Sequence, residues 1–176
     1  MLDLPETAAA QEISMEKNPH HLVMGELVDF LTHDTLADTH DERYRQKIAQ
    51  YLVQVCGYDK KDILSRREVT IRTGQSAASV RVDFLVQAGK KTGMMVRFAP
   101  GSLVTRRLSN LALSRIIFSY QIPYVVTTNG EDAEIINGLS GKVTGHGIDS
   151  IPDKNTLAAL DSRTSFPVIS DDLFKK

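Results

Sequence analysis

Asp83 is an acidic residue whose type and position could do chemistry, because it stands within an alternating apolar segment, VRVDFLV (80–86). An aspartate is disfavoured in the middle of a strand unless it has a partner, so we expect Asp83 to be paired. In the next segment, GMMVRFA (93–99), Val96 and Phe98 stand two residues apart and therefore share one face of a strand. An apolar pair cannot bind Mg²⁺, which requires oxygen ligands, and cannot activate water.

A second set of candidate ligands is crowded into one polar loop. It comprises His33, Asp34, Asp38 and His40. Their spacing fits no regular metal site, so we predict a polar loop and no bound metal. Cys56 is the single cysteine, which excludes a disulfide framework and a cysteine-based zinc site. It stands near a predicted helix end beside an apolar stripe, so we expect it to pack and not to react.

Charge is distributed very unevenly along the chain, although the net charge of the 176 residues is only −1. Residues 1–42 carry −9, residues 43–115 carry +11 and residues 116–176 carry −3. A central segment of this sign could attract phosphates through counterion release. The alternative is that its charges are spread over solvated faces and offset by the acidic N-terminal region.

The candidate nucleic-acid-binding residues come from this central segment. They are Arg43, Lys47, Lys90, Lys91, Arg106 and Arg107. Residues 1–20 are polar and without a clear period, which predicts a flexible acidic arm preceding a single domain over residues 21–176. No apolar run reaches the length of a membrane span and no signal pattern is present, so we expect a cytoplasmic protein.

The first helix is predicted by a capping box, Thr39 to Glu42, in which a hydroxyl and a carboxylate satisfy free amides at the helix start. We interpret Glu42 chiefly as a helix cap. Apolar residues at three- and four-residue spacing follow, and Gly57 ends the helix. The segment before it, residues 21–38, is read as a short apolar run and then a loop.

Alternation with a period of two predicts strands over residues 67–73, 80–86 and 93–99. A helix is expected over residues 103–120. A hairpin is expected over residues 123–138, with Asn129-Gly130 as a tight two-residue turn, and a short helix after Pro152. This order of elements predicts an α/β domain with a mixed sheet.

These segments, in this order, resemble the N-terminal nuclease-like domain of type I restriction enzyme R subunits, within the PD-(D/E)xK nuclease superfamily. The matching stretches are DERYRQKIAQYLVQVCGYDKKDI, VRVDFLV, MMVRFAPG, IPYVVTTNGEDAEIING and SIPDKNTL. The resemblance covers roughly residues 25–160. It implies a restriction-endonuclease-like fold, in which a mixed β-sheet is flanked by helices.

In that superfamily two carboxylates hold Mg²⁺, and the metal and a lysine activate water and stabilise charge at phosphorus. By this resemblance the six family positions fall on Glu42, Asp83, Val96, Phe98, Ala112 and Ile116. The two acids remain, whereas the Glu and Lys of the third strand are replaced by Val96 and Phe98. A slip of one residue would instead let Arg97 stand in for the lysine, but it would also move every neighbour to the wrong face.

Arg115 is the fifth member of the predicted vestigial site, with Glu42, Asp83, Val96 and Phe98. The expected helix has an apolar arc, with Arg115 near its centre, and an opposite polar arc. The apolar arc contains Val104, Leu108, Leu111, Ala112 and Phe118, and the polar arc contains Arg106, Arg107, Asn110 and Ser114. A charge on an apolar face is costly unless it is paired, so we expect Arg115 to turn inward to Asp83 or Glu42.

Taken together, the residues predict a catalytically degenerate relative of these nuclease domains that keeps weak, non-specific binding of DNA or RNA. No cofactor is expected. Two alternatives stay open: a Mg²⁺-dependent nuclease whose catalytic residues have migrated, and a protein-interaction or scaffolding module with no role in nucleic-acid binding. A homo-oligomer or a protein partner is compatible with each of these.

Overall fold

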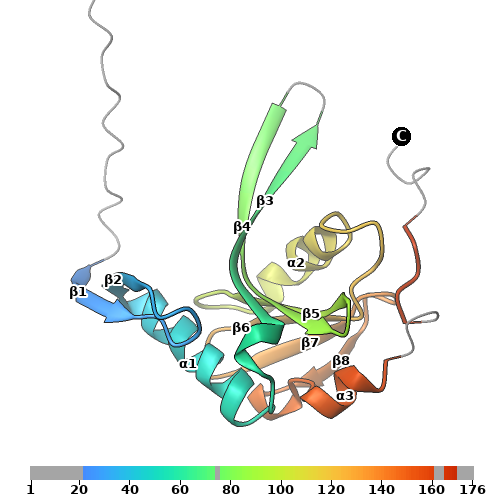
Figure 1. Ribbon diagram of the computed structural model, residues 1–176. Coiled ribbons are helices and arrows are strands. Elements are labelled where there is room, and N and C mark those ends of the chain that lie inside the picture. The colour runs from blue at the N-terminus through green and yellow to red at the C-terminus, as the bar shows by residue number, and fades with distance from the viewer. Residues whose placement is uncertain (1–21, 74–75, 161–164, 170–176) are drawn as a thin grey trace, which may run out of the picture.

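The computed structural model describes residues 22–73, 76–160 and 165–169 (Figure 1). Strands and α-helices are joined by three short 3₁₀ helices, η1 to η3. In chain order the elements are β1 (Val23–Val28), β2 (Thr35–Thr39), α1 (His40–Gln54), η1 (Lys60–Asp62), β3 (Ile63–Thr73), β4 (Ser76–Ala88), β5 (Lys91–Phe98), η2 (Val104–Arg106), α2 (Arg107–Ser114), β6 (Tyr124–Thr128), β7 (Ala133–Asn137), β8 (Val143–His146), η3 (Ile148–Ser150) and α3 (Lys154–Ala158).

The main sheet has six strands in the order β3-β4-β5-β6-β7-β8. β5 and β6 are parallel and the other neighbours are antiparallel, so the sheet is mixed. The parallel pair needs a crossover connection, and this connection carries α2. The predicted architecture, a mixed sheet flanked by helices, is confirmed.

Helix α1 covers one face of the sheet, and its start follows the predicted cap. The Thr39 hydroxyl accepts the backbone N–H of Glu42 at 3.1 Å. Ile48 and Leu52 are buried from the helix side against Val96 and Val126 of the sheet. The helix therefore lies over Val96 and Phe98, the strand positions at which the resemblance expects catalytic residues.

Helix α2 covers the opposite face. Leu111 and Leu113 pack there with Met95 and Val125. The residues that follow these two in sequence, Val96 and Val126, pack under α1 instead. Because successive residues of a strand point to opposite faces, one continuous sheet separates the two apolar cores.

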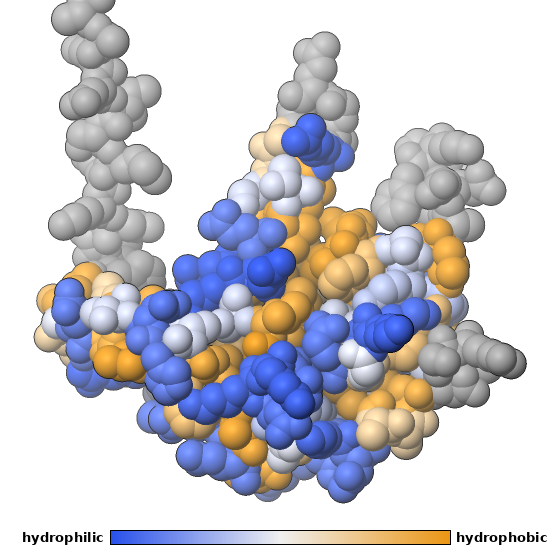
Figure 2. Space-filling model, in the orientation of Figure 1, coloured by the Kyte–Doolittle hydropathy of each residue, from blue (hydrophilic) through white to orange (hydrophobic). Residues whose placement is uncertain are grey.

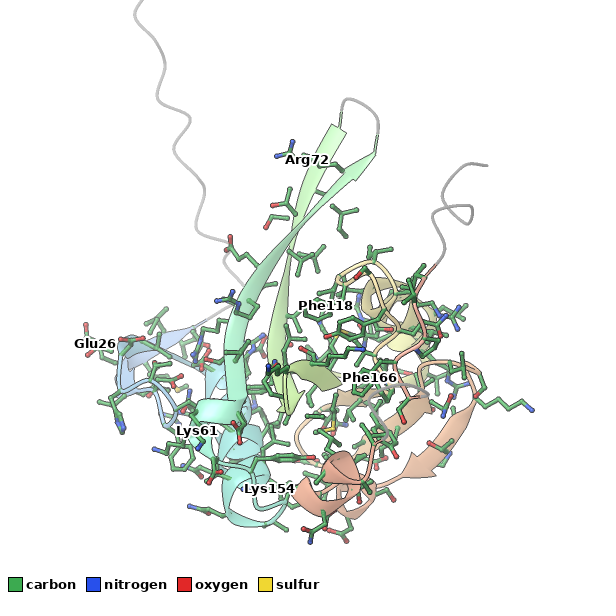
Figure 3. All side chains as sticks on the ribbon, turned by 45° about the vertical axis from the view of Figure 1, so that its right-hand side comes forward. Glu26, Lys61, Arg72, Phe118, Lys154 and Phe166 are labelled. Carbon is green, nitrogen blue, oxygen red and sulfur yellow. The ribbon has the colours of Figure 1, made fainter. Side chains whose placement is uncertain are left out.

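Strands β3 and β4 continue beyond the rest of the sheet as a long hairpin arm, with Arg72 near its outer end (Figures 1 and 3). Val69 and Val80 are cross-strand partners on the apolar side of this arm and pack against the α2 core. Glu68 and Arg81 are partners on the other side, and both are exposed. Figure 2 shows hydrophobic residues on the side of the arm towards α2 and hydrophilic residues towards β1 and β2.

The hairpin of β1 and β2 was not expected, since an apolar run and a loop were predicted there. Its turn is held by Asp29, whose carboxylate accepts the N–H groups of Leu31 and Thr32, both at 2.8 Å. His33 adopts a left-handed backbone with φ of 66°. Asp29 is a residue type that favours turns, so the sequence does carry a signal for this turn. The flanking strands, however, show no clear alternation of apolar and polar residues.

Helix α2 differs from the prediction in length and in orientation. It ends at Ser114, where Arg115 and Ile116 make bonds to carbonyls only three residues back, and it does not reach residue 120. The arc predicted to be buried is partly exposed, and Leu108 is 77% exposed. The arc predicted to be solvated contains Asn110 and Ser114, which are both buried.

The β6–β7 hairpin is present, but its turn is not the predicted two-residue turn. The last cross-strand pair is Thr128 with Ala133, so four residues form the loop. The Asn129 side chain accepts the N–H groups of Glu131 and Asp132, and of the two predicted turn residues only Gly130 has a positive φ. The short helix after Pro152 is confirmed as α3, capped by Asp153. Within the described residues, no helix has the length and apolar character that a membrane span requires.

Candidate functional site

Asp83 lies on β4 at the point where this strand separates from β5. The β4–β5 pairing runs from Ala88–Lys91 to Phe84–Val96. Beyond it, the buried Asp83 carboxylate accepts the backbone N–H of Phe98 at 2.9 Å. The Asp83 carboxylate thus satisfies a backbone amide that lies beyond the β4–β5 pairing. This is a structural role for the residue that the resemblance matches to a catalytic acid.

The second partner of Asp83 is Arg45 on α1. Its Nε lies 2.7 Å from Asp83 Oδ1, and its guanidinium carbon lies 5.1 Å from the centre of the Phe98 ring. Tyr44 stacks on the same ring at a centroid distance of 5.8 Å. The prediction that Asp83 is paired is confirmed, and its partners are an arginine of α1 and the backbone of the next strand.

Val96 and Phe98 are buried in the core beneath α1. Val96 is 0% exposed and Phe98 is 6% exposed, so neither leaves room for a polar group in its place. The two side chains offer carbon at the positions where the resemblance expects a carboxylate and an ammonium group. Nothing at these two positions can bind a cation or orient water.

Two further carboxylates, Asp29 and Glu42, lie beside this site and are bridged by Arg66. Arg66 Nη1 lies 2.5 Å from Asp29 Oδ2, and its Nη2 donates to Glu42 Oε1. The Gln46 side-chain amide donates to both acids, at 3.0 and 2.9 Å. Glu42 therefore belongs to a buried charged network, and the reciprocal half of the predicted capping box is replaced by these contacts.

The pKa of Asp29 shows how strongly this network favours its ionised form. Burial alone would raise the pKa, but hydrogen bonds from the Thr32 N–H, Gln46, Arg66 and the Leu31 N–H lower it to about 2. Burial lowers the pKa of Arg66, but its ion pairs with Asp29 and Glu42 outweigh this effect and raise the pKa.

Arg66 has a left-handed backbone, with φ of 49°, inside β3. Such a conformation persists in a non-glycine residue when the surrounding contacts favour it.

Arg97 lies at the other side of Asp83, with its Nε 3.8 Å from Asp83 Oδ2. That Nε is buried and has no hydrogen-bond partner among the described residues. Burial lowers the pKa of Arg97; the Asp83 charge raises it, and Arg106, Arg45 and Arg81 lower it further. Arg97 thus lies close to Asp83, but its Nε makes no hydrogen bond to the acid.

Arg115 does not enter this site, so the predicted pair with Asp83 or Glu42 is wrong. Its Nη2 donates to the backbone carbonyls of Gly138 and Leu139, at 3.1 and 3.3 Å. The helix ends before Arg115, so the residue is not on the arc that the helical projection assigned to it. Carbonyls in the β7–β8 connection thus accept from Nη2, whereas the buried Nε of Arg115 has no hydrogen-bond partner among the described residues.

The polar residues that α2 turns to the sheet are ones that the prediction had assigned to solvent. Arg107 forms a two-point ion pair with Glu134 of β7, with an Nε–Oε2 distance of 2.7 Å. Asn110 Nδ2 donates to Thr127 Oγ1 of β6 at 2.8 Å. Ala112 and Ile116, onto which the family's Gln-x-x-x-Tyr pattern falls, are both exposed.

The six candidate nucleic-acid-binding residues do not form one patch. Arg43 is paired with Asp38 by two bonds of 2.7 Å, and Lys47 lies over the Tyr44 ring. Lys90 and Lys91 lie at the β4–β5 turn, at the opposite end of β5 from Phe98. Arg107 is paired with Glu134, whereas Arg106 lines a pocket together with Arg97 and Phe98.

The loop of His33, Asp34, Asp38 and His40 makes protein contacts of its own. Asp34 accepts the Thr32 hydroxyl, and His40 packs edge-on against Tyr44. No group of three or more His, Cys, Asp or Glu side chains in the described ranges is arranged to hold a metal ion. Cys56 is buried in the α1 core, where burial raises the pKa of its thiol to about 11.

Two arginines that sequence reasoning did not assign to the site contact its acids: Arg45 and Arg66. Arg45 carried a usable signal, because it stands three residues after Glu42 and therefore shares its helix face. No sequence pattern indicated that Arg66 and Asp29 would meet, because their contact depends on how the β1–β2 hairpin and β3 are placed against α1.

Comparison with known families gives one match. The family model described as type I restriction enzyme R protein N terminus matches residues 40–152. The match begins with α1 and ends after β8, so it contains the six-stranded sheet, Asp83 and the two replaced positions. No curated protein and no solved structure matches the chain.

Proposed function

Since the chain belongs to the type I restriction enzyme R protein N-terminus family, we propose that it keeps the family's nuclease-like frame as a binding domain without phosphodiester cleavage. The proposed ligand is nucleic acid, held by its phosphates and without reading of the base sequence. The observation that carries the loss of catalysis is the environment of the Asp83 carboxylate, which binds Arg45 and the Phe98 N–H.

A Mg²⁺ site for hydrolysis needs several hard oxygen ligands that remain accessible to the metal, and a cation near the charge that develops at phosphorus. At Asp83 the oxygens already accept bonds from protein donors, and the neighbouring positions are filled by Val96 and Phe98. Asp29 and Glu42 are held by Arg66 and Gln46 in the same way. Guanidinium groups thus compensate the acids that a metal would otherwise neutralise.

The case for nucleic acid rests on the surplus of arginine beside this site. The acid nearest to Arg97 is Asp83. Three positive charges oppose it and lower the pKa of the Arg97 guanidinium: Arg106, Arg45 and Arg81. Arg67 and Arg72 add exposed positive charge along the arm. A surface of this kind attracts phosphates by counterion release, and the strength of that attraction falls steeply with salt.

Titration of fluorescent duplex DNA, single-stranded DNA and RNA at low and moderate salt tests this proposal. Without contacts to bases, we expect a Kd no better than about 10⁻⁴–10⁻⁶ M at physiological salt and tighter binding at low salt. Equal affinity for unrelated sequences is part of the expectation. Absence of binding to all three ligands at low salt would leave the family's frame without a nucleic-acid role.

A protein-interaction module is the second candidate, and one observation favours it. Val104 and Leu108 are 62% and 77% exposed on the outer side of η2 and α2, although they are large apolar residues. Exposed apolar groups that adjoin one another are typical of contact surfaces for proteins. If nucleic acid does not bind, substitution of Leu108 by Lys should abolish any self-association seen by light scattering.

A further inference from the structure

A pocket of about 330 Å³ lies between the end of β5 and the start of α2. Its wall contains backbone and side chains of the segment that follows β5 and one turn of the helix. The lining residues are Arg97, Phe98, Ala99, Pro100, Arg106, Ser109 and Asn110. The pocket therefore adjoins the vestigial site through Phe98 but opens on the side of the sheet that α2 covers.

The positive charge of this pocket is only partly compensated. Arg97 lines it, and among the described residues its acidic neighbour is Asp83, at 3.8 Å, a distance too long for a hydrogen bond. Asp83 is also shared with Arg45 at 2.7 Å. Arg106 makes no ion pair with any residue in the described part of the chain, and the Arg97 Nε–H finds no acceptor there.

A buried donor without an acceptor is unfavourable, and it is more so when the group is charged. Arg81 adds further positive charge beside Arg97, and its cross-strand neighbour Glu68 is exposed on the arm. Asn110 contributes a side-chain amide at the pocket wall, fixed in direction by its bond to Thr127. The pocket thus combines fixed donors with a charge that an anion would complete.

We propose that this pocket binds one phosphate group, with Arg97 and Arg106 as its two cationic contacts. A phosphate presents several acceptor oxygens, and a planar guanidinium can bond two of them at once. This inference builds on the nucleic-acid complex proposed above. In that complex the bound group is a phosphate of the nucleic-acid backbone, which lies beside Asp83. The position differs from a metal-dependent cleavage site, because no carboxylate lines the pocket.

Two variants test the assignment, with a third as the matched control. Arg106→Gln removes an exposed charge from the pocket, and Arg97→Gln removes the half-buried one. Lys142→Gln removes one exposed charge before β8, at the opposite edge of the sheet from the arm. Thermal unfolding of each variant shows whether it remains folded, which matters for Arg97 because of its contact with Asp83.

The first measurement uses nucleic acid. On duplex DNA each neutralised phosphate contributes about 0.9 to the slope of log K against log salt. We expect Arg106→Gln and Arg97→Gln each to weaken binding by roughly threefold to tenfold at low salt and to reduce the slope by about 1. Lys142→Gln should leave the slope unchanged. Binding by both pocket variants with wild-type affinity and slope would overturn the pocket while leaving the proposed function intact.

The second measurement uses inorganic phosphate and pyrophosphate, compared with chloride at equal ionic strength. A ligand that binds the folded state raises the unfolding temperature, so the wild-type protein should be stabilised and Arg106→Gln should lose that effect. Protection by free phosphate with no binding of nucleic acid would retain the pocket and refute its proposed role in a nucleic-acid complex. If the pocket substitutions change neither the binding of nucleic acid nor the thermal stabilisation by phosphate, the pocket is not a phosphate-binding site.

Discussion

The Asp83 carboxylate accepts the backbone N–H of Phe98 at 2.9 Å, so the acid on β4 holds the backbone of a residue at the end of the neighbouring strand β5. The same carboxylate binds Arg45, whose guanidinium lies over the Phe98 ring. The three residues form one packed unit of an acid, a cation and an aromatic ring. On the proposed function, this packed unit occupies the place at which the resemblance expects a catalytic geometry.

Asp83→Ala should therefore destabilise the protein. It removes one partner of a buried ion pair and leaves Arg45 and the Phe98 N–H unsatisfied, which costs on the order of 3–5 kcal/mol. Urea unfolding followed by circular dichroism measures the change. Asp59→Ala, which breaks the exposed pair with Lys154, serves as control and should leave the urea midpoint nearly unchanged.

The purified protein is expected not to cut DNA or RNA in Mg²⁺ or Mn²⁺. Hydrolysis requires a held metal, an oriented water and a cation near the developing charge, and Val96 and Phe98 remove two of these. Long incubations with supercoiled, linear and single-stranded substrates measure this. Metal-dependent cutting by the wild-type protein that disappears in the still-folded Arg45→Ala or Asp83→Ala variant would establish the migrated-site alternative; cutting that persists in both points to a contaminant.

The stability contributed by Asp29 should depend on pH in the acid range. Its pKa is about 2 in the folded protein against 3.8 ordinarily, so the unfolded state binds the proton more tightly. The contribution is fully present above about pH 4 and is lost as the pH falls towards 2; it amounts to roughly 2 kcal/mol.

The pH dependence is measured as the difference in unfolding free energy between the wild-type protein and Asp29→Asn. That difference should be largest near pH 5 and shrink by about 2 kcal/mol at pH 2. The comparison cancels the titration of other acids with lowered pKa, such as Glu134 and Asp153. A difference that stays constant over this range would contradict the role assigned to the Asp29 network.

The orientation of α2 can be tested with two leucines of the same helix. Leu113 is 5% exposed and packs in the core, whereas Leu108 is 77% exposed. We expect Leu113→Ala to cost about 2–5 kcal/mol of unfolding free energy and Leu108→Ala less than about 0.5 kcal/mol. Chemical denaturation gives both values, and the reverse order would support the arc that the helical projection predicted.

Local patterns in the sequence were sufficient for much of the fold. Alternation with a period of two located β4 and β5, the Thr39 hydroxyl marked the start of α1, and Asp153 caps the short helix after Pro152. These features were predictable because each depends on residues within one turn or one strand of each other. The resemblance assigns Asp83, Val96 and Phe98 to family positions on the same kind of local evidence, since they stand in short, ordered segments.

The partners of those residues were decided by the tertiary structure. Arg45 is 38 residues from Asp83 in sequence, and Asp29 and Arg66 meet only because two hairpins approach α1. Helix α2 turns Arg107 and Asn110 to the sheet together with Leu111 and Leu113, because Glu134 and Thr127 lie there to pair with the two polar residues, which no helical projection could show. A sequence fixes which face of a helix is polar, but whether that face is solvated depends on the charges that the fold places opposite to it.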